Sequence, residues 1–193
     1  MADVALIKSR RFGDDRGWFS ETYNARSFKS AGIDVAFVQD NHSLSGPAGT
    51  LRGLHFQRAP HAQGKLVRCV RGRIFDVVVD LRAGSPTFGK SLSVELTAAG
   101  GEQLWVPVGF AHGFATLEPD CEVIYKVTDF YAPDCEGGVR WDDPDIAIAW
   151  PLPDGGPALS PKDVVLPFLA DIDPPFVFGP EDRPLGPLTA LSV

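Results

Sequence analysis

The fold is decided by residues 51–72, LRGLHFQRAPHAQGKLVRCVRG. This stretch holds four arginines, two histidines and a lysine, yet its spacing predicts two strands joined by a loop. With a period of two, Lys65 shares a strand face with Val67 and Cys69. We therefore expect the lysine to point in the same direction as apolar side chains.

The first of these two strands has an unusually polar face, formed by Gly53, His55 and Gln57. In a small all-β domain, a sheet with one polar, chargeable face usually lines a cavity. The alternative is an exposed face of solvated charges. Alternation alone does not decide between them.

Short β-branched and aromatic runs separated by turns extend from residue 11 to residue 128, which predicts a sandwich or barrel. The expected strands cover residues 19–23, 35–41, 50–56, 65–71, 74–81, 91–96, 104–106, 114–117 and 122–128. Arg71-Gly72-Arg73 predicts a tight hairpin turn, and Gly84-Ser85-Pro86 a looser one.

One short helix is signalled near the C-terminus, in LSPKDVVLPFL. Ser160 is a good N-cap, Pro161 suits the first helical position, and Asp163 lies in the first turn, where an anion is favoured. The last 22 residues, from Ile172, contain five prolines and predict an extended arm or a disordered tail. We therefore expect a single domain over 1–171, followed by an arm over 172–193.

Charge is distributed unevenly along the 193 residues, whose net charge is −7. Residues 1–90 hold 14 of the 18 Lys+Arg and 8 of the 25 Asp+Glu, so the first part is basic and the remainder acidic. An acidic whole argues against nucleic-acid or anionic-membrane binding, while a basic half suits a compact anion such as a phosphate ester. The opening MADVALIKSRR fits neither a signal peptide nor a membrane span, and three cysteines without a CxxC spacing indicate a reducing, cytoplasmic location.

Two of the four histidines are candidates for chemistry. His42 and His61 are adequately explained as surface or structural residues, whereas His55 lies on the polar face and His112 lies between glycines in VPVGFAHGF. A metal site needs several convergent His or carboxylate ligands. Here Gln57 stands where a second ligand would be wanted, and the next strand presents the cation Lys65, so we expect no metal.

Tyr125 alternates with Val123 and Val127 in EVIYKVTDF and should point inward with them. By itself it would be a core tyrosine whose hydroxyl finds a backbone partner. Together with an inward histidine and lysine, it would complete a set suited to proton transfer next to a carbonyl group.

Six motifs, RGLHFQ, AQGKLVR, SPTFG, QLWVPVGFAHGF, YKVTDFYAP and RWDDP, occur in an order and spacing that closely resemble the dTDP-4-dehydrorhamnose 3,5-epimerases. The resemblance runs from about residue 11 to residue 169. It implies a dimeric, cupin-type antiparallel β jelly roll without metal or cofactor. It also implies an isomerase that inverts dTDP-4-dehydro-6-deoxy-D-glucose at C3 and C5, giving dTDP-4-dehydro-L-rhamnose.

The resemblance also assigns roles. His55 matches the general base, Tyr125 the general acid and Asp163 the carboxylate that orients His55, while Lys65 and His112 match positions that face the sugar. The remaining matches to substrate-binding positions are the pyrophosphate ligands Arg16 and Arg52, the stacking residues Phe19 and Phe130, and Glu21, Gln39, Asp40, Asn41, Glu136 and Lys162. Many relatives carry tyrosine at position 130.

Three alternatives remain open from the sequence. A mono-epimerase, acting at C3 or C5 alone, would share the same His, Tyr and Asp. A non-catalytic cupin that only binds a nucleotide sugar is disfavoured because base, orienting carboxylate, cation and phenol are all present. A metal-dependent cupin oxygenase or isomerase is disfavoured by Lys65 and the missing ligands.

Overall fold

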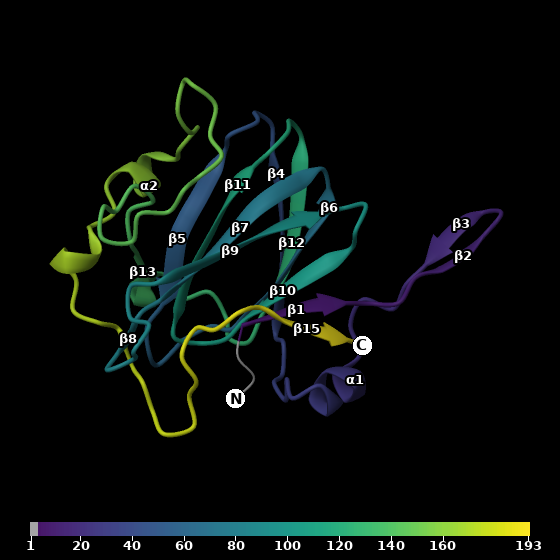
Figure 1. Cartoon of the computed structure of the whole chain (residues 1–193), viewed down its shortest axis with the longest axis horizontal. Coiled ribbons are helices and arrows are strands. Elements are labelled where there is room, and N and C mark those ends of the chain that lie inside the picture. The colour runs from purple at the N-terminus through teal and green to yellow at the C-terminus, as the bar shows by residue number, and fades with distance from the viewer. Residues whose placement is uncertain (1–3) are drawn as a thin grey trace.

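Two β-sheets face each other in the computed structural model, which describes residues 4–193 (Figure 1). The six-stranded sheet has the order β15-β1-β10-β6-β12-β4, and the five-stranded sheet the order β13-β5-β11-β7-β9. The strands are β1 (Ala5–Lys8), β2 (Phe12–Asp14), β3 (Gly17–Phe19), β4 (Gln39–Ser45), β5 (Leu51–Gln57), β6 (Lys65–Arg71), β7 (Arg73–Asp80), β8 (Arg82–Ala83), β9 (Ser91–Thr97), β10 (Glu102–Val106), β11 (Phe110–Thr116), β12 (Cys121–Val127), β13 (Glu136–Gly138), β14 (Phe176–Val177) and β15 (Thr189–Ser192). The helices are α1 (Ala25–Ser30) and α2 (Pro161–Val164), with 3₁₀ turns at Pro133–Cys135 and Leu169–Asp171.

Within these sheets neighbouring strands are antiparallel, except for the parallel pair β1–β15. The antiparallel jelly roll expected from the sequence is therefore confirmed. No helix in the described part of the chain has the length and apolar character needed to cross a membrane.

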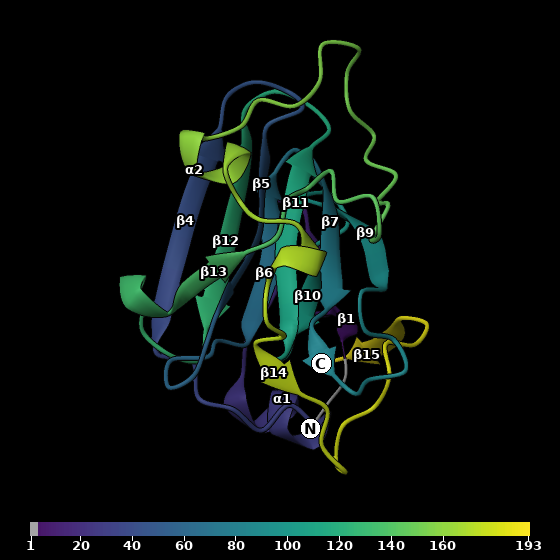
Figure 2. The same ribbon diagram turned by 90° about the vertical axis from the view of Figure 1, so that its left-hand side faces the viewer.

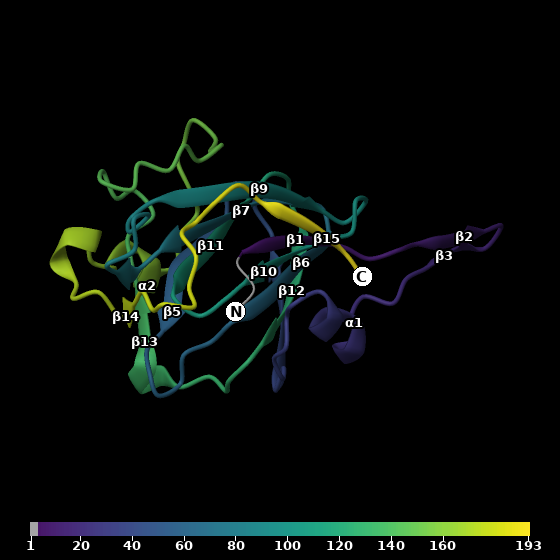
Figure 3. The ribbon, with the colours of Figure 1, turned by 60° about the horizontal axis from the view of Figure 1, so that its bottom comes forward.

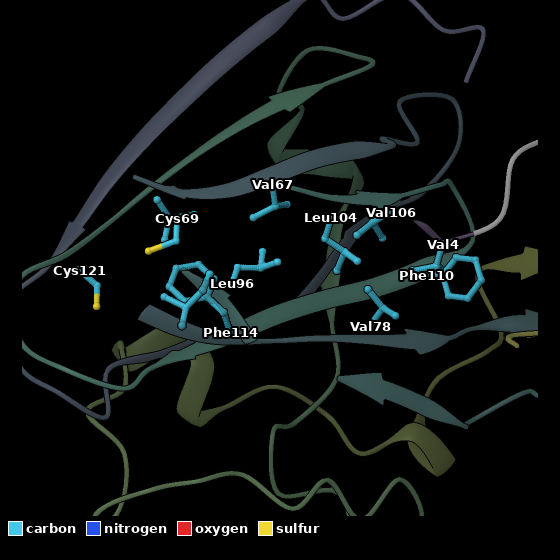
Figure 4. Close-up of a cluster of buried hydrophobic side chains, with 12 residues drawn as sticks. Val4, Val67, Cys69, Val78, Leu96, Leu104, Val106, Phe110, Phe114 and Cys121 are labelled. Atoms are coloured by element: carbon cyan, nitrogen blue, oxygen red, sulfur yellow. The ribbon is translucent and has the colours of Figure 1, made fainter. Parts of the chain in front are cut away.

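The main core lies between the two sheets (Figure 4). Its buried side chains come from alternate positions of both sheets and include Val67, Cys69, Ile74, Val78, Leu104, Phe110, Phe114 and Val123. Lys65 occupies the next inward position of β6 before Val67 and Cys69, as the alternation predicted. The inner face of the jelly roll thus changes from apolar to polar along the strands.

A second core covers the outer face of the five-stranded sheet, where the chain from Val139 to Phe176 packs across it. Val77 and Val79 of β7 point into this core, while Ile74 and Val78 point into the first. Burial on both faces explains why β7 reads as a nearly continuous apolar run.

The predicted hairpin at Arg71-Gly72-Arg73 is wrong. β6 pairs with β10 and β12, whereas β7 pairs with β9 and β11, so the chain crosses from one sheet to the other at Gly72. Gly72 has φ +81°, a value that glycine adopts without strain in either kind of turn. The glycine signalled a turn without specifying which strands it joins.

The N-terminal third also differs from expectation. The predicted strand at 19–23 is wrong: β3 ends at Phe19, and the chain continues into α1, whose N-cap Asn24 accepts a hydrogen bond from the backbone N–H of Arg26. The strand predicted at 35–41 begins only at Gln39. β2 and β3 form a hairpin that extends away from both sheets (Figures 1 and 3).

The C-terminal segments lie against the body of the molecule. The predicted N-cap of α2 is confirmed, since Ser160 Oγ accepts from the backbone N–H of Asp163. Beyond residue 171, β14 pairs with β8 and β15 pairs with β1, so the chain end returns next to the N-terminal strand (Figure 2).

Candidate active site

A cavity of about 230 Å³ lies between the two sheets. Its lining residues are Ser43, Arg52, His55, Lys65, His112, Phe114, Tyr125, Ser160, Lys162 and Asp163. A second cavity, of about 130 Å³, shares His55, Lys65 and Tyr125 with the first. It adds Gln39, Asn41, Phe56, Gln57, Gln63, Tyr131 and Glu136. The three shared residues therefore lie where the two cavities meet.

The shared residues come from opposite sheets. His55 is on β5 of the five-stranded sheet, and Lys65 and Tyr125 are on β6 and β12 of the six-stranded sheet. The polar face of β5 thus lines a cavity, which settles the choice that alternation left open.

His55 and Asp163 form a hydrogen-bonded pair. His55 Nε2 lies 2.6 Å from Asp163 Oδ1, and the carboxylate is nearly buried. Burial raises the pKa of Asp163, but hydrogen bonds from His55 and Ser160 outweigh it and bring the pKa below its usual range. The charged carboxylate holds the proton on Nε2, which leaves Nδ1 of a neutral imidazole as a proton acceptor.

The environments of Lys65 and Tyr125 shift their pKa values in opposite directions. Burial lowers the pKa of Lys65 to about 8, against the opposing influence of Asp76 and Glu136. Burial raises the pKa of Tyr125, against the opposing influence of Arg52. At neutral pH the lysine is therefore mostly a cation and the tyrosine a neutral phenol.

A second histidine–carboxylate pair lies on the five-stranded sheet, which faces the strand of Lys65 across the cavity. His112 Nε2 lies 2.8 Å from Asp76 Oδ1, and both side chains are buried. Asp76 Oδ2 has no hydrogen-bond partner in the described residues. Its charge lies close enough to Lys65 to oppose the fall in the lysine's pKa.

Glu136 connects the two cavities. It forms an ion pair with Lys162 of α2 and accepts a hydrogen bond of 2.9 Å from Tyr131 Oη. Burial raises the pKa of Glu136, but the Lys162 and Tyr131 contacts outweigh it and lower the pKa. The Glu136–Lys162 ion pair therefore joins the lining of the second cavity to that of the first.

The structure brings most of the predicted residues together. Those lining one or both cavities are His55, Tyr125, Asp163, Lys65, Arg52, His112, Gln39, Asn41, Glu136 and Lys162. Asp40 alternates to the other face of β4 and pairs with Lys126. Phe130 is 62% exposed and lines neither cavity, whereas its neighbour Tyr131 lines the second.

The hairpin residues lie away from both cavities of this chain. Arg16 pairs with Asp14 inside the hairpin, and the Phe19 side chain is 69% exposed. Glu21 follows the hairpin and is also exposed. None of the three lines either cavity.

Sequence reasoning missed several lining residues, chiefly Ser43, Phe114, Ser160, Gln63 and Tyr131. Ser43 is the clearest omission, because its buried hydroxyl has no hydrogen-bond partner in the described residues. It follows Gln39 and Asn41 at a spacing of two, so alternation along β4 would have found it.

Within residues 4–193, no three His, Cys, Asp or Glu side chains are grouped as ligands for a metal ion. A partly buried histidine–carboxylate pair faces a cationic lysine and a neutral phenol across a polar cavity. This arrangement can remove a proton beside a carbonyl group, stabilise the enolate and return a proton from another direction.

Comparisons with known proteins identify relatives that match most of the length of this chain. The family model for dTDP-4-dehydrorhamnose 3,5-epimerase matches residues 1–171. A relative of that name from Sinorhizobium fredii is 52% identical over 92% of this chain and 91% of its own, and one from Pseudomonas aeruginosa is 54% identical over 89% and 93%. The crystal structure of the Bacillus anthracis dTDP-4-dehydrorhamnose 3,5-epimerase with TDP and PPi bound is 50% identical, with a TM-score of 0.84 over 86% of this chain and 94% of that one.

Proposed function

This chain belongs to the dTDP-4-dehydrorhamnose 3,5-epimerase family, and on that premise we propose the roles of its residues in the reaction. The protein is an isomerase that inverts dTDP-4-dehydro-6-deoxy-D-glucose at C3 and C5, giving dTDP-4-dehydro-L-rhamnose. The relatives reported above are named as 3,5-epimerases, so the single-inversion alternative is not favoured.

His55 is the general base. Its Nδ1 accepts the proton from C3 or C5, and the C–H electron pair moves into the enolate formed with the C4 carbonyl. Asp163 is a positioning residue that keeps the other ring nitrogen protonated, which makes Nδ1 the acceptor. The resulting imidazolium is stabilised by the same carboxylate.

Lys65 stabilises the enolate oxygen. C3 and C5 both flank the C4 ketone, so one cation serves both proton abstractions. Tyr125 then donates its phenolic proton to the enolate carbon from the face opposite His55. The support for these roles is one observation: His55 and Tyr125 line the same two cavities from opposite sheets.

The substrate-binding roles extend around this centre. Arg52 and Lys162 supply cationic groups in the first cavity. The Arg52 guanidinium binds oxygens of the diphosphate, and the Lys162 ammonium group contacts the ligand beside it. Gln39, Asn41 and Glu136 supply polar groups in the second cavity. Tyr131, rather than Phe130, is positioned there to contact the ligand.

The protein acts as a homodimer. The β2–β3 hairpin projects with Phe12, Trp18 and Phe19 exposed, and such aromatic exposure marks an interaction surface. In a closed two-fold dimer each hairpin would carry Arg16, Phe19 and Glu21 to the partner's nucleotide pocket.

Two further expectations remain proposals. Residues 1–171 form one catalytic domain, and residues 172–193 are an arm attached to it. The location is cytoplasmic, in keeping with three cysteines that are free thiols in the described structure. Cell fractionation with a tagged chain would test the location.

Incubation of the substrate in heavy water tests the proposed chemistry. The wild-type protein should give the doubly inverted sugar with deuterium at C3 and C5. His55→Ala should lose both inversion and exchange while still binding dTDP. Exchange at the wild-type rate in His55→Ala would assign the base to another group.

A further inference from the structure

The β2–β3 hairpin has two different faces. Directly paired residues share a face, so Phe12 and Phe19 lie on one side, and Gly13 and Trp18 lie on the other. The Phe12 side carries the guanidinium of Arg10, 4.7 Å from the Phe12 ring centre. The Trp18 side carries that of Arg11, 4.1 Å from the Trp18 ring centre.

Within residues 4–193, only the Trp18 side is tied to the body of the molecule through these arginines. Arg11 donates from Nη1 to the carbonyl of Ala99 and from Nη2 to the carbonyl of Ala98, the latter over 2.9 Å. Both carbonyls belong to the turn between β9 and β10. The guanidinium is thus held between the indole and this turn.

The turn is shaped around Arg11. Gly101 has φ +71°, and a Cβ at that position would lie 2.4 Å from Arg11 Nη2. A side chain there would displace the guanidinium. Glycine therefore serves two purposes at this position, the backbone conformation and the space for Arg11.

Gln103 holds the base of the same hairpin. Its buried amide nitrogen donates to the carbonyl of Thr22 over 2.7 Å and to Ser9 Oγ over 3.3 Å. Ser9 precedes the hairpin and Thr22 follows it, so one side chain joins both legs. Gln103 holds the hairpin to the body at its base, and Arg11 ties its Trp18 side to the β9–β10 turn.

We propose that Arg11 is a positioning residue for substrate binding, which locks the Trp18 face of the hairpin to the β9–β10 turn. The lock leaves the Phe19 face directed outward, toward the nucleotide pocket of a second copy of this chain. The inference rests on the proposed dimer, in which that pocket is completed by the hairpin. Without this contact, the hairpin adopts other orientations. The apparent affinity for the nucleotide then falls in proportion to the fraction of molecules whose hairpin is still oriented for binding.

Steady-state kinetics and dTDP titration of Arg11→Ala test this inference, with Gly101→Ala as a second variant that displaces the unmodified arginine. If the competent fraction falls to about one tenth, KM and the dTDP dissociation constant rise about tenfold while kcat stays within about twofold. Arg26→Ala is the matched control, because Arg26 is an exposed arginine on α1 whose side chain makes no hydrogen bond or ion pair in the described structure. Its KM should equal that of the wild type.

Phe19→Ala, measured in parallel, separates this inference from the proposed dimer function. A raised KM in Phe19→Ala with a wild-type KM in Arg11→Ala would overturn the lock and leave the hairpin's role standing. A wild-type KM in both would overturn the role of the hairpin itself. A lower melting temperature in Arg11→Ala without a change in KM would reduce Arg11 to a structural residue and would also overturn the proposal.

Discussion

Lys65 shows how burial adjusts one side chain for this chemistry. Its amine lies in the cavity between the sheets and donates to the backbone carbonyl of His55 over 3.2 Å. Burial lowers the pKa of Lys65 to about 8, so the amine is still mostly charged at neutral pH. Because little water surrounds the buried ammonium group, its charge is weakly screened and stabilises the negative oxygen of an enolate.

The rate of epimerisation should therefore fall on the alkaline side of neutrality. Lys65 is charged below its pKa and neutral above it, so enolate stabilisation is present below pH 8 and is lost as pH rises through about 8. The pH dependence of kcat measures this directly. Lys65→Arg keeps its charge throughout this range, and its residual activity should lack the fall; the same fall in Lys65→Arg would assign it to another group.

Asp163 should matter less to the rate than His55. Removal of a general base typically costs roughly 10²–10⁴-fold in rate. Asp163→Asn leaves the imidazole in place but replaces the charged acceptor, so kcat should fall by less than in His55→Ala. Single-turnover rates of the two variants provide the comparison, and an equal or larger loss in Asp163→Asn would show that the carboxylate itself takes part in proton transfer.

Among the elements of the fold, β6 and β7 are joined at Gly72, where the chain crosses from the six-stranded to the five-stranded sheet. The φ of Gly72 is +81°, and a Cβ would lie 2.5 Å from Cys121 Sγ in the main core. Positive φ and a close contact to a buried side chain both oppose substitution. The crossing between β6 and β7 therefore depends on this glycine.

Gly72→Ala should lower the free energy of unfolding by about 1–3 kcal/mol, the range for backbone strain at such a position. Urea unfolding measures the change. Gly46→Ala is the control, because Gly46 has an ordinary φ and a Cβ added there would meet no other atom within 4 Å. Equal stability of Gly72→Ala and the wild type would show that the turn adapts without cost.

The strands also show what the sequence could predict. Period-two alternation correctly directed Lys65, His55 and Tyr125 inward, because side chains of a strand must alternate between its faces. Alternation says nothing about which strands pair, so the sequence predicts a hairpin at Gly72 where the chain crosses from one sheet to the other. The placement of Tyr131 rather than Phe130 at the cavity follows from the chain's course after β12, where no regular period applies.

Across the molecule as a whole, the C-terminal arm extends beyond the matched family domain, which ends at residue 171. It covers a buried ion pair between Asp80 and Arg82, since Arg82 donates to the carbonyl of Arg183 and lies 5.1 Å from the Phe178 ring centre. Farther on, Leu191 packs against the core beneath α1. The arm therefore packs against two separate regions of the domain, the Asp80–Arg82 ion pair and the core beside α1.

A chain ending at residue 171 should melt below the full chain, by roughly 2–4 °C for each 1 kcal/mol that the arm contributes to stability. Shortening by residues 189–193 alone should lower it less, because the cover over Arg82 stays in place. Calorimetry of the three chains gives the order. Equal melting temperatures would mean that the arm lies on the body without stabilising it.

In the proposed mechanism, His55 and Tyr125 act from opposite faces of the sugar. The most direct test is to incubate Tyr125→Phe with the substrate in heavy water and to analyse the recovered sugar by NMR. The raised pKa of Tyr125 keeps its phenol protonated, so the wild type has an acid ready to donate. Without the hydroxyl, His55 can still remove a proton and return deuterium on its own face. We expect deuterium in uninverted sugar and a loss of inverted product of roughly 10²–10⁴-fold, the range for a general acid. Doubly inverted product at near the wild-type rate would contradict this mechanism.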